Sequence, residues 1–123
     1  MDKNAPKRMM YAIDLDGTLT KTIQWPGEPP PEPHTNRIKQ TNKLFVTGHV
    51  IIIYTARRET MRAETEMWLE QHGVYHHALV MGQGKLPADC YVDDKGICPE
   101  AFFGDGECRC VKMYKERLKK NGK

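Results

Sequence analysis

Short apolar runs alternate with amphipathic segments along this chain. The run MMYAID (9–14) is typical of an interior strand. The continuous β-branched run VIIIY (50–54) predicts a strand buried on both faces, as in a parallel sheet. Two shorter runs, HALVM (77–81) and DCYVDD (89–94), are further strand candidates.

Two segments between these runs carry apolar side chains at helical spacing, and each predicts an amphipathic helix. The first, residues 35–49, has a Thr35 cap, a stop near Gly48 and a stripe formed by Ile38, Thr41, Leu44 and Phe45. The second, residues 57–73, ends at Gly73, and its stripe is formed by Met61, Thr65, Trp68, Leu69 and His72. We also expect Met67 to belong to the core.

Strands that alternate with helices predict an α/β fold: a three-layer, Rossmann-like parallel sheet with helices on both faces and right-handed crossovers. The chain has 123 residues, of which 39% are hydrophobic, and this suffices for one domain (1–123) without a large cap domain. The proline-rich segment 20–34 predicts an extended loop. Residues 96–110 fit either a last strand or a packed loop.

Composition and charge exclude few classes of function. The net charge is +3, and much of it lies in the basic tail 111–123, which is weak evidence for nucleic-acid binding. Apolar runs are far shorter than the ~20 residues of a membrane-spanning helix, and the first residues have no signal-peptide pattern, so we expect a cytoplasmic protein without membrane contact. The four cysteines lack zinc-site spacing and predict free, mostly buried thiols.

Polar side chains stand where the predicted strands end. Asp14 and Asp16 follow the first strand, Thr55 the second, and Asp93 and Asp94 the last. In parallel sheets the ligand crevice lies outside the carboxyl ends of the strands, so these residues should meet at one edge. Asp14 and Asp16, two positions apart, would share a face, and such a pair needs a cation or a proton to relieve its repulsion.

This edge has the donors of a magnesium-dependent phosphoryl site. Asp14 and Asp93, with a backbone carbonyl of the loop after Asp14, offer the hard oxygen ligands that Mg²⁺ prefers. Lys85 and the Thr55 hydroxyl, with amides of a loop that Gly17 allows to curl, would neutralise a phosphoryl group. The chemistry then predicted is nucleophilic attack by Asp14 to give an aspartyl-phosphate, with Asp16 as general acid and base and its carbonyl towards the metal.

These motifs resemble those of the haloacid dehalogenase superfamily. DLDGTLT, IIIYTAR, the lysine before LPADCYVDDK and the double aspartate occur in the superfamily's order between Met9 and Lys95. The chain is similar, more narrowly, to small capless phosphatase-like members of phages and capsular-polysaccharide loci. This resemblance implies a phosphomonoester hydrolase acting on a sugar phosphate, a nucleotide or a nucleic-acid end.

The resemblance also implies the role of each motif residue. Asp14 is the nucleophile and Asp16 the general acid and base. The Mg²⁺ ligands are Asp14, Asp16 and Asp93, and Asp94 supports these ligands. The phosphoryl group is bound by Thr55, Lys85, Gly17 and Ala56. For Asp94, metal binding, a salt bridge to Lys85 and turn capping are the alternatives.

Three residues near the expected site have alternative roles. Arg57 and Arg58 either bind a second anionic group of the substrate or are simply solvated. Trp25 in the proline-rich loop either stacks on a base or sugar or pins the loop to the core.

Two other functions are left open. A phospho-accepting regulatory domain has a similar size and residue set, but its acidic pair precedes the acceptor, whereas here the double aspartate comes last. A nucleic-acid-end binding or processing accessory would use the basic tail and the arginines, and strong salt dependence would reveal it. The partner is thus a phosphorylated small molecule or a nucleic-acid end, and a homo-oligomer is also compatible with the sequence.

Overall fold

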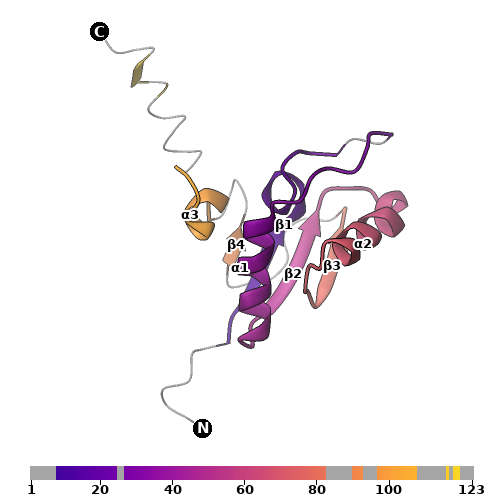
Figure 1. Ribbon diagram of the computed structural model, residues 1–123, viewed down its shortest axis with the longest axis horizontal. Coiled ribbons are helices and arrows are strands. Elements are labelled where there is room, and N and C mark those ends of the chain that lie inside the picture. Colours follow the sequence, from indigo (N-terminus) through magenta and orange to yellow (C-terminus); the bar gives the residue numbers. More distant parts are fainter. Residues whose placement is uncertain are drawn as a thin grey trace.

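The centre of the molecule is a four-stranded parallel sheet in the order β3-β2-β1-β4 (Figure 1). This computed structural model describes residues 8–24, 27–82, 90–92, 97–107, 116 and 118–119. The strands are β1 (Met10–Asp14), β2 (Val50–Thr55), β3 (Ala78–Met81) and β4 (Cys90–Val92). The predicted α/β class and the parallel sheet are confirmed. Three strands fall within their predicted runs, and β2 extends one residue beyond its run, to Thr55.

Both predicted helices are present as α1 (Thr35–Val46) and α2 (Arg62–Gln71), the latter preceded by the single turn η2 (Glu59–Met61). The expected Thr35 cap is wrong, because the helix begins at Thr35 itself and His34 takes the capping position without a side-chain cap. The His34 backbone amide instead donates to the Leu19 carbonyl, 2.7 Å away. Within the described residues, every helix is too short or too polar to cross a membrane.

The segment after β4 forms a short helix where we expected a strand or a loop. This helix, α3 (Pro99–Phe103), has Pro99 in its first turn, where the missing amide hydrogen costs nothing. It ends at Gly104, whose φ of +66° is the left-handed conformation typical of a helix C-cap.

The core lies on the face of the sheet that carries Ile13, Ile51 and Ile53, each fully buried. One cluster joins these strand residues to side chains of all three helices: Ile38 from α1, Trp68 and Leu69 from α2, and Phe103 from α3. The described helices thus pack on one face of the sheet, and the three-layer arrangement stays a prediction.

Two burial predictions need correction. Ile52 and Tyr54, on the other face of β2, keep part of their surface exposed, so the strand is not fully buried on both faces. Met67 is 68% exposed, although we expected it in the core. It lies one helical step, about 100°, from the stripe through Trp68, and therefore points outward.

The described parts of the proline-rich segment, 20–24 and 27–34, form an extended loop, as predicted, and project beyond the carboxyl end of the sheet (Figure 1). Its two arms are joined where the Lys21 amide donates to the Glu32 carbonyl at 2.9 Å. The Trp68 indole N–H of α2 donates to the Pro31 carbonyl, also at 2.9 Å. The loop is therefore attached to the core at its carboxyl-terminal arm.

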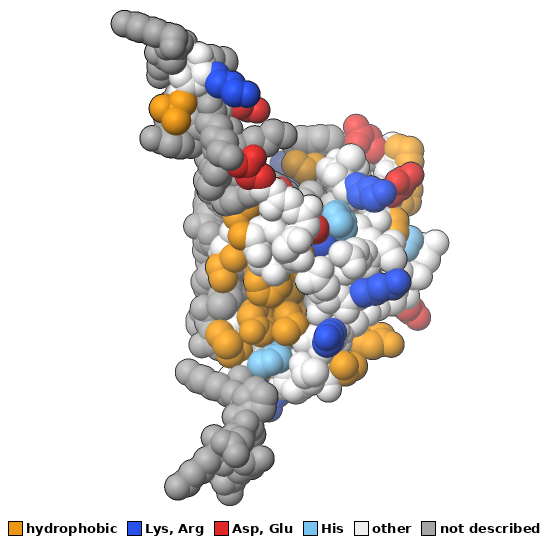
Figure 2. All heavy atoms as spheres, turned by 60° about the vertical axis from the view of Figure 1, so that its left-hand side comes forward, with side chains coloured by type: hydrophobic (Ala, Val, Ile, Leu, Met, Phe, Trp, Pro, Cys, Tyr) orange, Lys and Arg blue, Asp and Glu red, His pale blue; other side chains and the backbone are white. Residues whose placement is uncertain are grey.

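Hydrophobic side chains gather on the face shown in Figure 2. A hollow of about 560 Å³ lies between α1 and α3 and is lined by Tyr11, Gln40, Lys43, Leu44, Thr47 and Phe102. It contains none of the predicted site residues.

Candidate functional site

The loop that follows β1 brings two carboxylates to the same end of the sheet. After Asp14 the chain forms one irregular turn, η1 (Leu15–Leu19), in which Asp16 and Gly17 leave the helical conformation. Gly17 has a φ of +76°, which favours glycine. Its amide donates to the Thr20 hydroxyl at 2.9 Å, which closes the turn. Asp14 therefore ends the strand and Asp16 stands on a fixed loop beside it.

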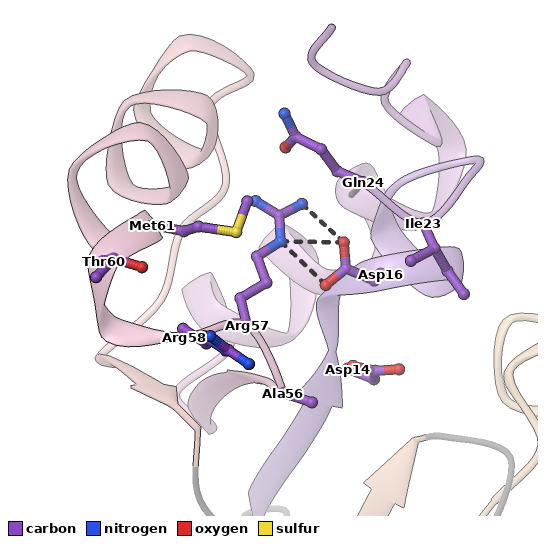
Figure 3. A pocket seen from close by; sticks show the side chains of 9 residues that line it. All are labelled: Asp14, Asp16, Ile23, Gln24, Ala56, Arg57, Arg58, Thr60 and Met61. Atoms are coloured by element: carbon purple, nitrogen blue, oxygen red, sulfur yellow. Dashed lines mark hydrogen bonds and ion pairs between the residues drawn. The ribbon is translucent and has the colours of Figure 1, made fainter. Parts of the chain in front are cut away.

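Asp16 is held on both of its carboxylate oxygens. The Thr55 hydroxyl donates to Oδ2 at 2.7 Å. Arg57 donates from Nη2 to Oδ1 at 2.7 Å and from Nε to Oδ2 at 3.0 Å, a bidentate ion pair (Figure 3). The side chains of Asp16 and Arg57 are only 14% and 4% exposed, so water screens the pair weakly.

A second layer of hydrogen bonds fixes Arg57. Its Nη1 donates to the Thr65 hydroxyl at 3.0 Å, and that hydroxyl donates to the Met61 carbonyl at 2.7 Å. The first turn of α2 thus supports the guanidinium from behind. We had expected Thr65 only as part of an apolar stripe, and the sequence has no signal for its contact with Arg57.

The carboxylates of Asp14 and Asp16 line a pocket of about 660 Å³. Its lining consists of Asp14, Asp16, Ile23, Gln24, Ala56, Arg57, Arg58, Thr60 and Met61 (Figure 3). In this view the Asp16 carboxylate faces Arg57, whereas the Asp14 side chain lies apart from the guanidinium. Asp14, at the end of a core strand, is thus presented to the pocket.

The structure brings together most of the predicted site residues that it describes. Asp14, Asp16, Ala56, Arg57 and Arg58 line the pocket. Thr55 is buried behind Asp16 with its hydroxyl directed at the carboxylate, and the Gly17 amide is directed at Thr20. The roles of Thr55 and Gly17 in phosphoryl binding stay predictions. Four predicted site residues lie outside the described part of the chain: Trp25, Lys85, Asp93 and Asp94. The side chains of Cys90, Cys108 and Cys110 and most of the basic tail lie outside it as well. Cys98 is buried, and its thiol donates to a Glu100 carboxylate oxygen at 3.0 Å.

The metal prediction rests in part on residues that are not described. Among the described residues, His, Cys, Asp and Glu side chains nowhere form a group of three that could hold a metal ion. The expected third ligand, Asp93, is outside this part of the chain. Asp14 and Asp16 both line the pocket, and a carboxylate and a backbone carbonyl are oxygen ligands of the hard type that Mg²⁺ prefers.

A second arginine–aspartate pair supports the same loop from the other side. Arg37 of α1 donates from Nε and Nη2 to the Asp105 carboxylate at 2.6 and 2.9 Å, and from Nη1 to the Thr18 carbonyl of η1 at 3.2 Å. Its guanidinium lies 5.3 Å from the centre of the Phe103 ring. Sequence reasoning missed this network, although Arg37 stands four residues before Thr41 on the apolar stripe of α1.

The surroundings of Asp105 and His34 lower the pKa of both groups. The Arg37 hydrogen bonds hold the pKa of Asp105 below its ordinary value, against an opposing effect of burial. Burial lowers the pKa of His34, and the nearby Arg37 lowers it further, despite the Asp105 carboxylate 3.7 Å from its Nε2. The region therefore favours an ionised aspartate beside a neutral histidine.

Comparisons with known proteins support the fold. No protein-family model and no curated protein matches the chain. A crystal structure of a structural-genomics target from Vibrio cholerae is similar with a TM-score of 0.56 and 24% identity, over 88% of this chain and 97% of that one. A conserved protein from Bacteroides thetaiotaomicron is similar with a TM-score of 0.61 and 22% identity, over 90% of this chain and 93% of that one. At these identities the similarity concerns the fold alone.

Proposed function

We propose that the protein is a magnesium-dependent phosphomonoester hydrolase that works through an aspartyl-phosphate on Asp14. The proposal includes the three-layer fold and the catalytic motifs of the haloacid dehalogenase superfamily, which the sequence resembles. The observation that carries it is the placement of the two aspartates: Asp14 ends β1 at an open pocket, and Asp16 is oriented beside it by Thr55 and Arg57.

The first half-reaction transfers the phosphoryl group to the protein. A carboxylate oxygen of Asp14 forms a bond to phosphorus while the bond from phosphorus to the leaving oxygen breaks, and a protonated Asp16 gives its proton to that oxygen. In the second half-reaction a water molecule attacks phosphorus, Asp16 takes its proton, and the bond to Asp14 breaks. Phosphate leaves, and both carboxyl groups return to their initial states.

The hydrogen bonds at Asp16 affect how its carboxyl group can act in the two half-reactions. Thr55 and Arg57 occupy both oxygens of the carboxylate, so at least one of these contacts must be exchanged before Asp16 can reach a leaving group. The same contacts restrict its rotamers, which lowers the entropic cost of orienting the acid. Arg57 is therefore assigned to positioning Asp16 in the resting enzyme, and its expected contact with substrate requires that exchange.

The donors present fit Mg²⁺. The Asp14 carboxylate and the Asp16 carbonyl are hard oxygen ligands, and Asp93 would supply a third. Bound there, the ion would neutralise charge on the phosphoryl oxygens and relieve the repulsion between the two carboxylates. Lys85, Thr55, Ala56 and Gly17 are the further candidates for contacts to the phosphoryl group.

The test is phosphate release from a panel of sugar phosphates, nucleotides and phosphorylated oligonucleotides, with Mg²⁺ and with EDTA. We expect turnover with Mg²⁺ and its loss with EDTA. Asp14→Asn should abolish turnover because the amide is a far weaker nucleophile, whereas Glu70→Gln, at an exposed site on α2, should leave it unchanged. Unimpaired turnover by Asp14→Asn would disprove the mechanism.

A further inference from the structure

The pocket beside the two aspartates has an apolar side. Ile23, from the proline-rich loop, lines it and is 55% exposed, and Met61 lines it from the start of α2. An exposed isoleucine in a pocket wall offers apolar surface whose removal from water is worth about 25 cal/mol per Å². This wall therefore favours an apolar group on the bound molecule.

The same pocket has one cation available among the described lining residues. Arg57 is occupied by Asp16, but Arg58 is exposed and forms no ion pair within the part of the chain that the structure describes. The adjacent acid, Glu59, is paired with Arg62 at 2.7 Å, and this hydrogen bond lowers the pKa of Glu59. In Figure 3 the Arg58 side chain lies apart from the Asp16 carboxylate that Arg57 faces.

Neutral polar side chains, which could serve a sugar without competing with the phosphate and the metal for a charged group, are few among the described lining residues. Gln24 is buried and its amide donates to the Glu28 carbonyl at 3.2 Å, which leaves Thr60 as the exposed neutral polar side chain among the described lining residues. A sugar ring would lose hydrogen bonds to water here without replacing most of them. A nucleic-acid strand would need several cations along its backbone, and Arg58 supplies one.

We propose that the substrate is a phosphate monoester whose leaving group carries an apolar part of aromatic size together with a second anionic group. The apolar part would lie on Ile23 and Met61, and the second anion would pair with Arg58. A pocket of about 660 Å³ has room for such a leaving group beyond the phosphate. This inference rests on the proposed hydrolase function and specifies its substrate class.

Three esters of primary alcohols test the inference, because their intrinsic reactivities are similar: benzyl phosphate, 4-carboxybenzyl phosphate and glucose 6-phosphate. We expect kcat/KM to be highest for 4-carboxybenzyl phosphate and lowest for glucose 6-phosphate, with about tenfold between successive substrates. Ile23→Ser should lower kcat/KM for both benzyl esters about tenfold and leave glucose 6-phosphate within about twofold. Arg58→Gln should remove only the advantage of the carboxylate.

Matched controls are available on the surface. Met67→Ser replaces an exposed apolar side chain of α2, and Lys39→Gln an exposed cation of α1; neither residue lines the pocket. Both should leave the order of the three substrates unchanged.

The outcomes separate the two proposals. Hydrolysis of all three esters at equal kcat/KM, or an equal loss on all three in Ile23→Ser, would overturn the substrate class and leave the hydrolase intact. Absence of hydrolysis of any phosphate monoester with Mg²⁺ would overturn the hydrolase itself. Preference for a 5′-phosphorylated oligonucleotide, with steep loss of binding in salt, would overturn the small-molecule class in favour of a polymer.

Discussion

The Arg57–Asp16 and Arg37–Asp105 pairs have nearly the same construction in different surroundings. Each is a bidentate ion pair with an arginine at most 6% exposed and an aspartate at most 17% exposed. Each also touches the loop after β1, one through the Asp16 side chain and the other through the Thr18 carbonyl. However, the first pair lines the pocket, whereas the second packs against Phe103.

The comparison teaches that a buried ion pair cannot by itself assign a catalytic role. Burial, distance and hydrogen bonding are alike in the two pairs, so these quantities cannot separate them. The separating feature is the pocket beside Asp16 and the neighbouring Asp14 at a strand end. We expect the pairs to behave alike in folding and differently in turnover.

The largest expected effect separates the pairs by activity. Asp16→Asn removes the group that transfers the proton in the proposed mechanism, so kcat/KM should fall about 10³-fold. Asp105→Asn should keep kcat/KM of the folded protein within about threefold, because Asp105 lies outside the pocket lining. Steady-state hydrolysis, corrected for the folded fraction by circular dichroism, measures both. Equal losses in the two variants would mean that Arg37 and Asp105 also control the site.

The next effect concerns stability and its dependence on pH. Asp105→Asn leaves the Arg37 guanidinium buried without a counter-charge, which should lower the free energy of unfolding by about 3 kcal/mol at neutral pH. Because Arg37 lowers the Asp105 pKa below 3.8, the unfolded chain binds the proton more readily, and this stabilisation is lost as pH falls through the folded value. Urea unfolding should therefore show the stabilities of the two proteins converging as the pH falls below 3.8, the ordinary pKa of an aspartate. A difference that stays constant over this range would contradict the ion-pair explanation.

The smallest effect comes from the glycines next to the two aspartates. Gly17 and Gly104 have φ values of +76° and +66°, and an alanine Cβ at Gly17 would meet only Ile23 Cγ1, at 3.9 Å. Without a clash, Gly17→Ala and Gly104→Ala should each cost about 1 kcal/mol of stability from backbone strain. Thermal unfolding measures this cost, and only Gly17→Ala should also reduce turnover. Equal turnover in both variants would show that the η1 loop tolerates the change.

Much of the fold was predictable because it depends on local periodicity. The apolar runs at 9–14 and 50–54 predicted β1 and β2, and the helical stripes predicted α1 and α2. Met67 is exposed despite its apolar side chain, because angular position on a helix decides burial before residue type does. The expectation for 96–110 missed α3, since a helix of five residues is too short to show a helical period.

The sequence predicted only those residues of the candidate site that stand at strand ends or within motifs. The sequence predicted that Asp14, Asp16 and Thr55 would meet, because parallel strands align their carboxyl ends. It did not predict that Arg57 would bind Asp16, 41 residues away, or that Arg37 would bind Asp105, 68 residues away. Such pairs depend on how the helices pack on the sheet, which periodicity does not specify.

The hydrogen bond from Trp68 to the Pro31 carbonyl has a spectroscopic consequence. It joins α2 to the proline-rich loop; the pocket residue Met61 directly precedes α2, and the pocket residue Ile23 lies on that loop. The chain contains a second tryptophan, Trp25, and its replacement by phenylalanine leaves Trp68 as the single strong fluorophore. The emission maximum of that protein would report movement of the loop away from the helix, without a label.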